Sequence, residues 1–151
     1  MSYSSKKIHQ FTYVQMSSFL FSRELFIPSS VDGLEECLFI IKQVGEEFKL
    51  DLEQKLSLQT VTVESVENAI IHGNKNIREL KVRFNISITI KEIVIEVEDQ
   101  GDGFSINSVP SPISDNNIRK ESGRGIFFIK CFSNSICLLG KGNIIRIYID
   151  R

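Results

Sequence analysis

Two neighbouring segments of this chain alternate apolar and polar side chains, and this pattern constrains its fold more than any other feature. The apolar positions of the first segment are Val82, Phe84, Ile86, Ile88 and Ile90. The segment Ile93–Glu98 alternates in the same way after the short turn Lys91-Glu92. Successive side chains of a strand point to opposite faces, so each segment predicts a strand with one apolar and one polar face. Together they predict a hairpin in a sheet that buries one face only.

Helices are expected on both sides of this hairpin in the sequence. Apolar residues recur every three or four positions from Asp32 to Phe48, which is typical of an amphipathic helix. A second helix is expected from Leu56 to His72, where Gly73-Asn74 ends it. A third, apolar helix is expected from Gly125 to Phe132.

Short strands complete the pattern. One is expected at Glu24–Ile27, and a final hairpin pairs Ser135–Leu139 with Ile144–Ile149. Two helices thus precede antiparallel strands, and one helix is inserted before the last hairpin. This order predicts an α+β fold, a two-layer α/β sandwich in which a mixed, mostly antiparallel sheet is covered on one face by helices.

The composition fits one domain with a substantial core, because 42% of the 151 residues are hydrophobic. The net charge of -1 provides no strong field for nucleic acid or an anionic membrane surface. No apolar run is long enough for a membrane span or a signal peptide, so a cytoplasmic protein is expected. Residues 1–20 are expected to form an N-terminal extension, either an extra strand or a flexible arm, ahead of a domain at 21–151.

The three cysteines, Cys37, Cys131 and Cys137, form no C-x-x-C pair. Two scattered histidines add too few ligands for a zinc site. Buried free thiols are therefore expected.

The first chemistry-bearing segment is the second expected helix. Glu64, Asn68 and His72 are spaced four residues apart and share one face of that helix. Taken alone, this stripe is typical of a solvated helix face. Asparagine is a poor helix former, however, and its carbonyl oxygen suits Mg²⁺, which binds few protein oxygens besides water and phosphate. In the functional interpretation Glu64 polarises a nucleophile and Asn68 holds a metal, whereas His72 caps the helix or takes part in the site.

The second segment, Asp99-Gln100-Gly101-Asp102-Gly103, directly follows the expected strand Ile93–Glu98. Its glycines permit a positive φ or the close approach of a flat ligand, although an ordinary polar turn has the same composition. The third segment, Ser122-Gly123-Arg124-Gly125, opens an apolar helix. Backbone N–H groups that glycine leaves accessible at the start of a helix attract phosphate. Glycines at this position also allow a helix to pack tightly.

In this order and spacing the three segments resemble the motifs of the Bergerat-fold (GHKL) ATPase and kinase superfamily. Glu64 to Gly73 resembles its N box, Asp99 to Phe104 its first glycine box, and Ser122 to Ile126 its second. The resemblance extends from Arg23 to Ile149. Within the superfamily the chain is most similar to the bacterial anti-sigma-factor serine-protein kinases, because an extended segment leads directly into the first helix and the lid between the glycine boxes is short.

The resemblance implies a role for each matching residue. Glu64 is implied as the base for the attacking serine hydroxyl, and Asn68 as the ligand of Mg²⁺. Asp99 is implied to accept from the adenine amino group of ATP, beside Gly101 and Gly103. The backbone amides of Gly123, Arg124 and Gly125 are implied to cradle the phosphates.

Two further positions are assigned to nucleotide binding although they depart from the family pattern. Asn143 follows Gly142 where the family usually has a threonine near adenine. Lys120 is the nearest cation ahead of Ser122, where the family usually has an arginine next to the second glycine box and this chain has Glu121.

Three functions remain open from the sequence. The resemblance implies an ATP-dependent serine kinase and anti-sigma factor, typically a homodimer, that holds a sigma factor and phosphorylates a small antagonist protein. The departures leave open an ATP-binding regulatory module without phosphoryl transfer. A stand-alone histidine-kinase-like ATPase domain is a third possibility. Retention of Glu64 favours the first of these over the second, because a pure nucleotide binder needs no base.

Overall fold

A computed structural model describes residues 19–103 and 124–151 of the chain. The strands are β1 (Phe21–Pro28), β2 (Lys81–Ile88), β3 (Glu92–Glu98), β4 (Ser135–Leu139) and β5 (Ile144–Asp150). The helices are α2 (Val31–Glu47), α3 (Leu52–Asn68) and α4 (Arg124–Cys131), and a π-helical turn η1 (Ala69–Gly73) continues α3.

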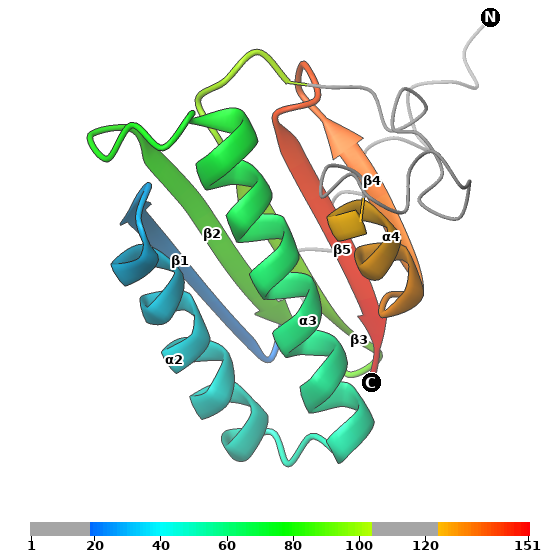
Figure 1. The fold of residues 1–151 in the computed structure, drawn as a ribbon. Helices are drawn as coiled ribbons and strands as arrows, with labels where there is room; N and C mark the ends of the chain where they lie inside the picture. Colours follow the sequence, from blue (N-terminus) through cyan, green and yellow to red (C-terminus); the bar gives the residue numbers. More distant parts are fainter. Residues whose placement is uncertain (1–18, 104–123) are drawn as a thin grey trace, which may run out of the picture.

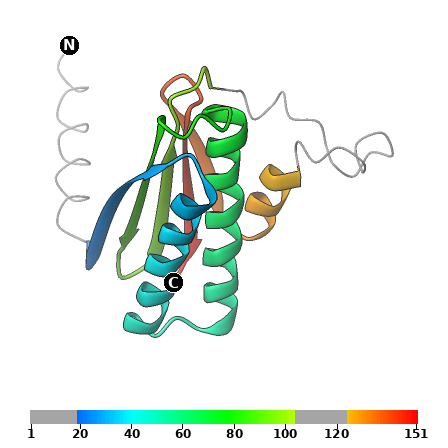
Figure 2. The ribbon, with the colours of Figure 1, turned by 60° about the vertical axis from the view of Figure 1, so that its left-hand side comes forward.

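The strands form one sheet in the order β1-β2-β3-β5-β4. Every pair of neighbours is antiparallel in the described part of the chain. Helices α2, α3 and α4 lie in front of the sheet in Figure 1, and the turned view of Figure 2 keeps all three on the same side of it. The expected α+β two-layer sandwich is therefore confirmed, with a sheet that is wholly antiparallel among the described strands.

The alternation of the central strands places one face of the sheet in the core. Phe84, Ile86 and Ile95 are completely buried, and the register sets Phe84 between Leu25 and Val97. Apolar residues of α2 and α3, among them Val44 and Leu58, close the core from the helical side. Because both layers contribute apolar stripes, burial of this face fixes which side of the sheet the helices cover.

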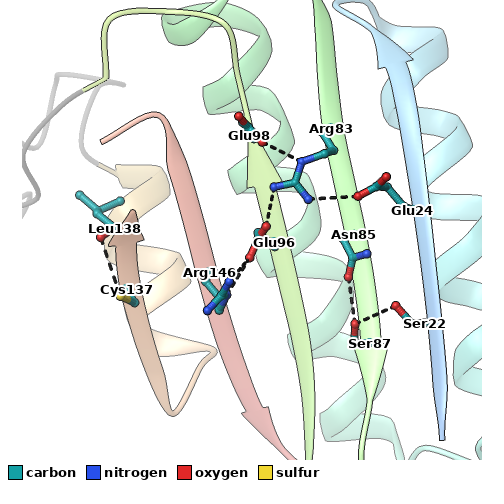
Figure 3. A network of polar contacts seen from close by, with 10 residues as sticks. All are labelled: Ser22, Glu24, Arg83, Asn85, Ser87, Glu96, Glu98, Cys137, Leu138 and Arg146. Carbon is teal, nitrogen blue, oxygen red and sulfur yellow. Dashed lines mark hydrogen bonds and ion pairs between the residues drawn. The ribbon is translucent and has the colours of Figure 1, made fainter. Parts of the chain in front are cut away.

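The opposite face of the sheet carries a network of ion pairs, which Figure 3 shows in front of the strands. The Arg83 guanidinium group donates to carboxylates of Glu24, Glu96 and Glu98, and Arg146 also donates to Glu96. Burial raises the pKa of Glu96, but the hydrogen bonds from Arg83 and Arg146 outweigh it and leave that pKa below its ordinary value. These cross-strand pairs satisfy charges within the sheet.

Helix α3 begins four residues earlier than the predicted Leu56. A capping box starts it: the Asp51 carboxylate accepts from the Gln54 N–H at 2.8 Å, and the Gln54 side chain accepts from the Asp51 N–H at 3.0 Å. Leu52 is 83% exposed, so the first turn lacks the buried apolar position that the periodicity would have used. At its other end the predicted helix is correct in reaching His72, but Asn68 is its last α-helical residue.

Two strand ends also differ from the predictions. Strand β1 is longer than Glu24–Ile27 because it pairs with β2 over its whole length, from Phe21 opposite Ile88. Strand β2 ends at Ile88 rather than Ile90, since the Thr89 hydroxyl accepts backbone N–H groups of the turn that follows.

The prediction of buried thiols is correct for one cysteine only. Cys37 is buried, and that burial raises the pKa of its thiol to about 12. Cys131 and Cys137 are free and exposed. Nowhere in residues 19–103 and 124–151 is a helix long and apolar enough to cross a membrane.

Candidate functional site

The end of helix α3 widens into the π-helical turn η1 directly after Asn68. The Asn74 N–H donates to the Ala69 carbonyl at 2.8 Å, five residues back, in place of the four-residue step of an α-helix. Single π-helical turns are frequent at functional sites. This turn carries the chain from Asn68 to Gly73, and it therefore separates two groups of predicted site residues.

The first group gathers where α4 begins. A methyl group on Gly125 would lie 2.8 Å from Glu64 Oε2 and within 3.3 Å of both polar atoms of the Asn68 carboxamide. A side chain at Gly125 therefore has no room, and the glycine lets the N-terminus of α4 approach these two residues of α3. Glu64, Asn68 and Gly125, three residues that the sequence predicts for one site, are brought together by this contact.

The environment of Glu64 makes its carboxylate more basic than usual. Burial raises the pKa of Glu64, and the like charge of Glu67 raises it further. A carboxylate of this kind, next to a carboxamide oxygen and a helix N-terminus, can accept a proton at the place where an anionic ligand is attracted.

The second group forms around Asp99, which directly follows β3. Asp99 Oδ1 accepts the Gly101 N–H at 2.8 Å. Burial raises the pKa of the Asp99 carboxyl group, and the hydrogen bond from Gly101 partly opposes this shift. A methyl group on Gly73 would lie 2.2 Å from Asp99 Cγ, so the carboxyl group occupies the space that a side chain at the end of η1 would fill.

Asn143 holds the backbone of Asp99 from the start of β5. Its side-chain Nδ2 donates to the Asp99 carbonyl at 2.9 Å, and its own carbonyl accepts the Asp99 N–H at 3.0 Å. Gly103 has a φ of 80°, and a methyl group there would lie 2.1 Å from the Lys141 carbonyl oxygen. The turn between β4 and β5 thus packs on the loop that follows Asp99. Asn143 holds the start of that loop through hydrogen bonds to the backbone of Asp99.

The remaining predicted positions are either exposed or outside the described residues. Arg124 is the exposed first residue of α4, and His72 is exposed on η1. Lys120 and Gly123 lie outside the described residues. Within residues 19–103 and 124–151 no group of three histidine, cysteine, aspartate or glutamate side chains is placed to hold a metal ion.

The donor set nevertheless fits Mg²⁺ and ATP. The Asn68 carbonyl oxygen is a hard donor that lies near the Glu64 carboxylate at Gly125, and Mg²⁺ takes few protein oxygens besides waters and phosphate oxygens. The Asp99 carboxyl group has a second oxygen, Oδ2, besides the one that accepts from Gly101, and this oxygen lies close to Gly73.

Sequence reasoning missed two residues of this arrangement, Asn74 and Gln100. The Asn74 side chain is completely buried, and its Oδ1 accepts the Gln100 N–H at 2.7 Å. The sequence signal for Asn74 is its place directly after Gly73, which is typical of the end of a helix.

Glu64→Gln is expected to raise the unfolding temperature at neutral pH, and the gain should shrink as the pH falls toward about 4. Because the pKa of Glu64 is raised in the folded state, its contribution to stability is complete only below its ordinary pKa of 4.5 and is lost as the pH rises through the folded value. Glutamine carries no charge to bury at any pH. The change should amount to a few degrees at most, since the side chain is only partly buried.

Thermal unfolding followed by circular dichroism at about pH 4 and about pH 7 measures this effect. Glu67→Gln is the control, because Glu67 is exposed and its substitution removes a negative charge that is not buried. An unfolding temperature of Glu64→Gln below that of the unsubstituted protein at neutral pH would contradict the assignment of a buried, destabilising charge.

Comparison with known proteins places this geometry in a family. A family model described as a histidine kinase-like ATPase domain matches residues 27–149. Compared by sequence, no curated protein matches the chain. Among solved structures, a chain in the crystal structure of the SiaB-SiaC complex from Pseudomonas aeruginosa is similar, with a TM-score of 0.61 and 11% identity over 96% of this chain and 96% of that chain. That likeness shows the fold, and the family match extends over most of the sequence. The chain therefore belongs to the histidine kinase-like ATPase domain family.

Proposed function

We propose that this chain is an ATP-dependent serine-protein kinase that is also an anti-sigma factor. In this proposal it holds a sigma factor, and it phosphorylates a serine of a small antagonist protein that would release the sigma factor. The observation that carries the kinase assignment is the Glu64 carboxylate, which has a raised pKa and lies against Asn68 and the start of α4. Membership of the ATPase family supports ATP as the phosphoryl donor.

The nucleotide would bind across the two groups of site residues. Asp99 Oδ2 would accept from the adenine amino group, with Gly101 and Gly103 beside the ring. The backbone amides at Gly123, Arg124 and Gly125 would attract the phosphates, because the N-terminus of a helix favours anions. Lys120 would add positive charge, and Asn143 would keep the Asp99 loop in place through the hydrogen bonds it makes.

The chemistry assigned to Glu64 is proton removal. The serine hydroxyl oxygen forms a bond to the γ-phosphorus, the bond from that phosphorus to the bridging oxygen of ADP breaks, and the hydroxyl proton passes to Glu64. Asn68 would hold Mg²⁺, which neutralises phosphate charge when it is bound. Because the pKa of Glu64 is raised, it lies closer to the working pH, and the carboxylate is a stronger base.

Protein partners are supported by the comparison as well as by the family resemblance. The similar solved structure is a complex of two proteins, and this chain covers 96% of the matched chain. A sigma factor and an antagonist are the partners that the resemblance to anti-sigma-factor kinases implies, together with a homodimeric state.

The experiment that tests the kinase assignment incubates candidate antagonist proteins with γ-labelled ATP and follows label on a partner serine. Glu64→Gln should lower transfer by roughly 10²–10⁴-fold, as expected for loss of a general base, while ATP affinity stays unchanged. Glu67→Gln is the matched control on the next turn of the same helix, and it should retain transfer because Glu67 is exposed.

Unchanged transfer by Glu64→Gln would remove Glu64 from the chemistry. If the unsubstituted protein binds ATP and its partner but labels no serine, the chain is an ATP-binding regulatory module instead.

Gly73→Ala should weaken ATP binding roughly tenfold or more, comparable to the loss of one charge-assisted hydrogen bond. Its methyl group would overlap the Asp99 carboxyl group and push it from its place. Gly45→Ala is the control, since a methyl group there meets the Lys55 side chain at an ordinary 3.4 Å in a helix away from the site. Calorimetric titration gives both affinities, and equal values for Gly73→Ala and the unsubstituted chain would show that Asp99 does not contact the nucleotide.

A further inference from the structure

Asn74 is a polar side chain with no exposed surface, directly after the π-helical turn η1. Burying a carboxamide is costly unless its donors and acceptor find partners. Asn74 satisfies them all: Nδ2 donates to Ser29 Oγ at 2.9 Å and to the Lys81 carbonyl at 3.1 Å, and Oδ1 accepts the Gln100 N–H at 2.7 Å.

Two of these contacts close into a ring with a third hydrogen bond. The Gln100 N–H donates to Asn74, Asn74 donates to the Lys81 carbonyl, and the Lys81 N–H donates to Gln100 Oε1 at 2.7 Å. The ring joins the end of η1, the first residue of β2 and the loop that begins at Asp99. The Ser29 hydroxyl extends it to the junction of β1 and α2, since it accepts from Asn74 and donates to the Leu80 carbonyl at 2.7 Å.

The ring holds the part of the loop next to Asp99, the residue assigned to nucleotide binding. Gln100 directly follows Asp99, and a methyl group on Gly101 would lie 2.5 Å from the Gly73 carbonyl oxygen. The loop and the end of η1 are therefore in backbone contact, and Asn74 supplies a polar tie between them. An aspartate in its place would lack both donors, and a glutamine would be one methylene longer.

We propose that Asn74 is a positioning residue that holds the Asp99 carboxyl group where it can accept from the adenine amino group. It acts through Gln100 and the shared backbone contact, and it does not touch the nucleotide. The role rests on the proposed function, because Asp99 is the adenine acceptor only if ATP binds at this site.

Asn74→Ala is expected to weaken ATP binding roughly tenfold, with turnover at saturating ATP kept within about threefold because Glu64 and Asn68 are unchanged. In the nucleotide-free protein, hydrogen exchange of the Gln100 amide should accelerate by about tenfold, since its acceptor is gone. A purely structural role would lower the unfolding temperature without this split between affinity and turnover.

Asn134→Ala is the matched control. The Asn134 side chain also bridges two segments, through bonds of 2.9 and 2.7 Å to Asp150, but at the opposite end of β5 from Asn143. Its substitution should leave ATP affinity and Gln100 exchange unchanged.

Gln100→Ala keeps the test decisive if Asn74→Ala does not fold. Gln100 is exposed, so its substitution spares the core while opening the ring at Lys81, and ATP affinity should fall by about threefold. An ATP affinity equal to that of the unsubstituted protein, in Asn74→Ala or in its place in Gln100→Ala, would overturn the proposal. If the unsubstituted protein binds no ATP, the proposed function fails, whereas accelerated Gln100 exchange in Asn74→Ala would still show that Asn74 positions the loop.

Discussion

The contact between Gly73 and the Asp99 carboxyl group is the interaction on which the arrangement of the candidate site depends. It brings the end of a helix and the end of a strand together, with only the Asp99 side chain between them. Three features make this possible: the π-helical turn that ends at Gly73, the hydrogen bonds of Asn143 to the Asp99 backbone, and the ring through Asn74. The second close approach, of Gly125 to Glu64 and Asn68, places the start of α4 beside the same helix.

The fold directs these contacts to one edge of the molecule. Because only one face of the sheet is apolar, all the described helices pack on that face (Figure 1), and the turn that ends α3 contacts the loop after β3 through Gly73. The other face is stabilised separately by the Arg83 and Arg146 ion pairs. The charged groups of the sheet are therefore satisfied by one another, and the partly buried carboxyl groups of Glu64 and Asp99 lie apart from that network.

The sequence predicts much of this because the decisive patterns are local. Alternation from Val82 to Val97 determines both strands and the buried face, and a glycine beside an acidic residue after a strand indicates the Asp99 loop. The contacts of Asn74 could not be predicted, since its partners Ser29 and Gln100 lie 45 and 26 residues from it along the chain. The exposure of Cys131 and Cys137 depends likewise on which faces of α4 and β4 pack into the core.

The most direct test of the account is the choice between adenine and guanine nucleotides. The Asp99 carboxylate can accept from the amino group of adenine, whereas guanine presents a carbonyl oxygen at that position. Calorimetric titration of the unsubstituted chain should show ATP binding at least about tenfold tighter than GTP, and Asp99→Asn should remove most of that preference. An undiminished preference for ATP in Asp99→Asn would contradict the placement of adenine at Asp99.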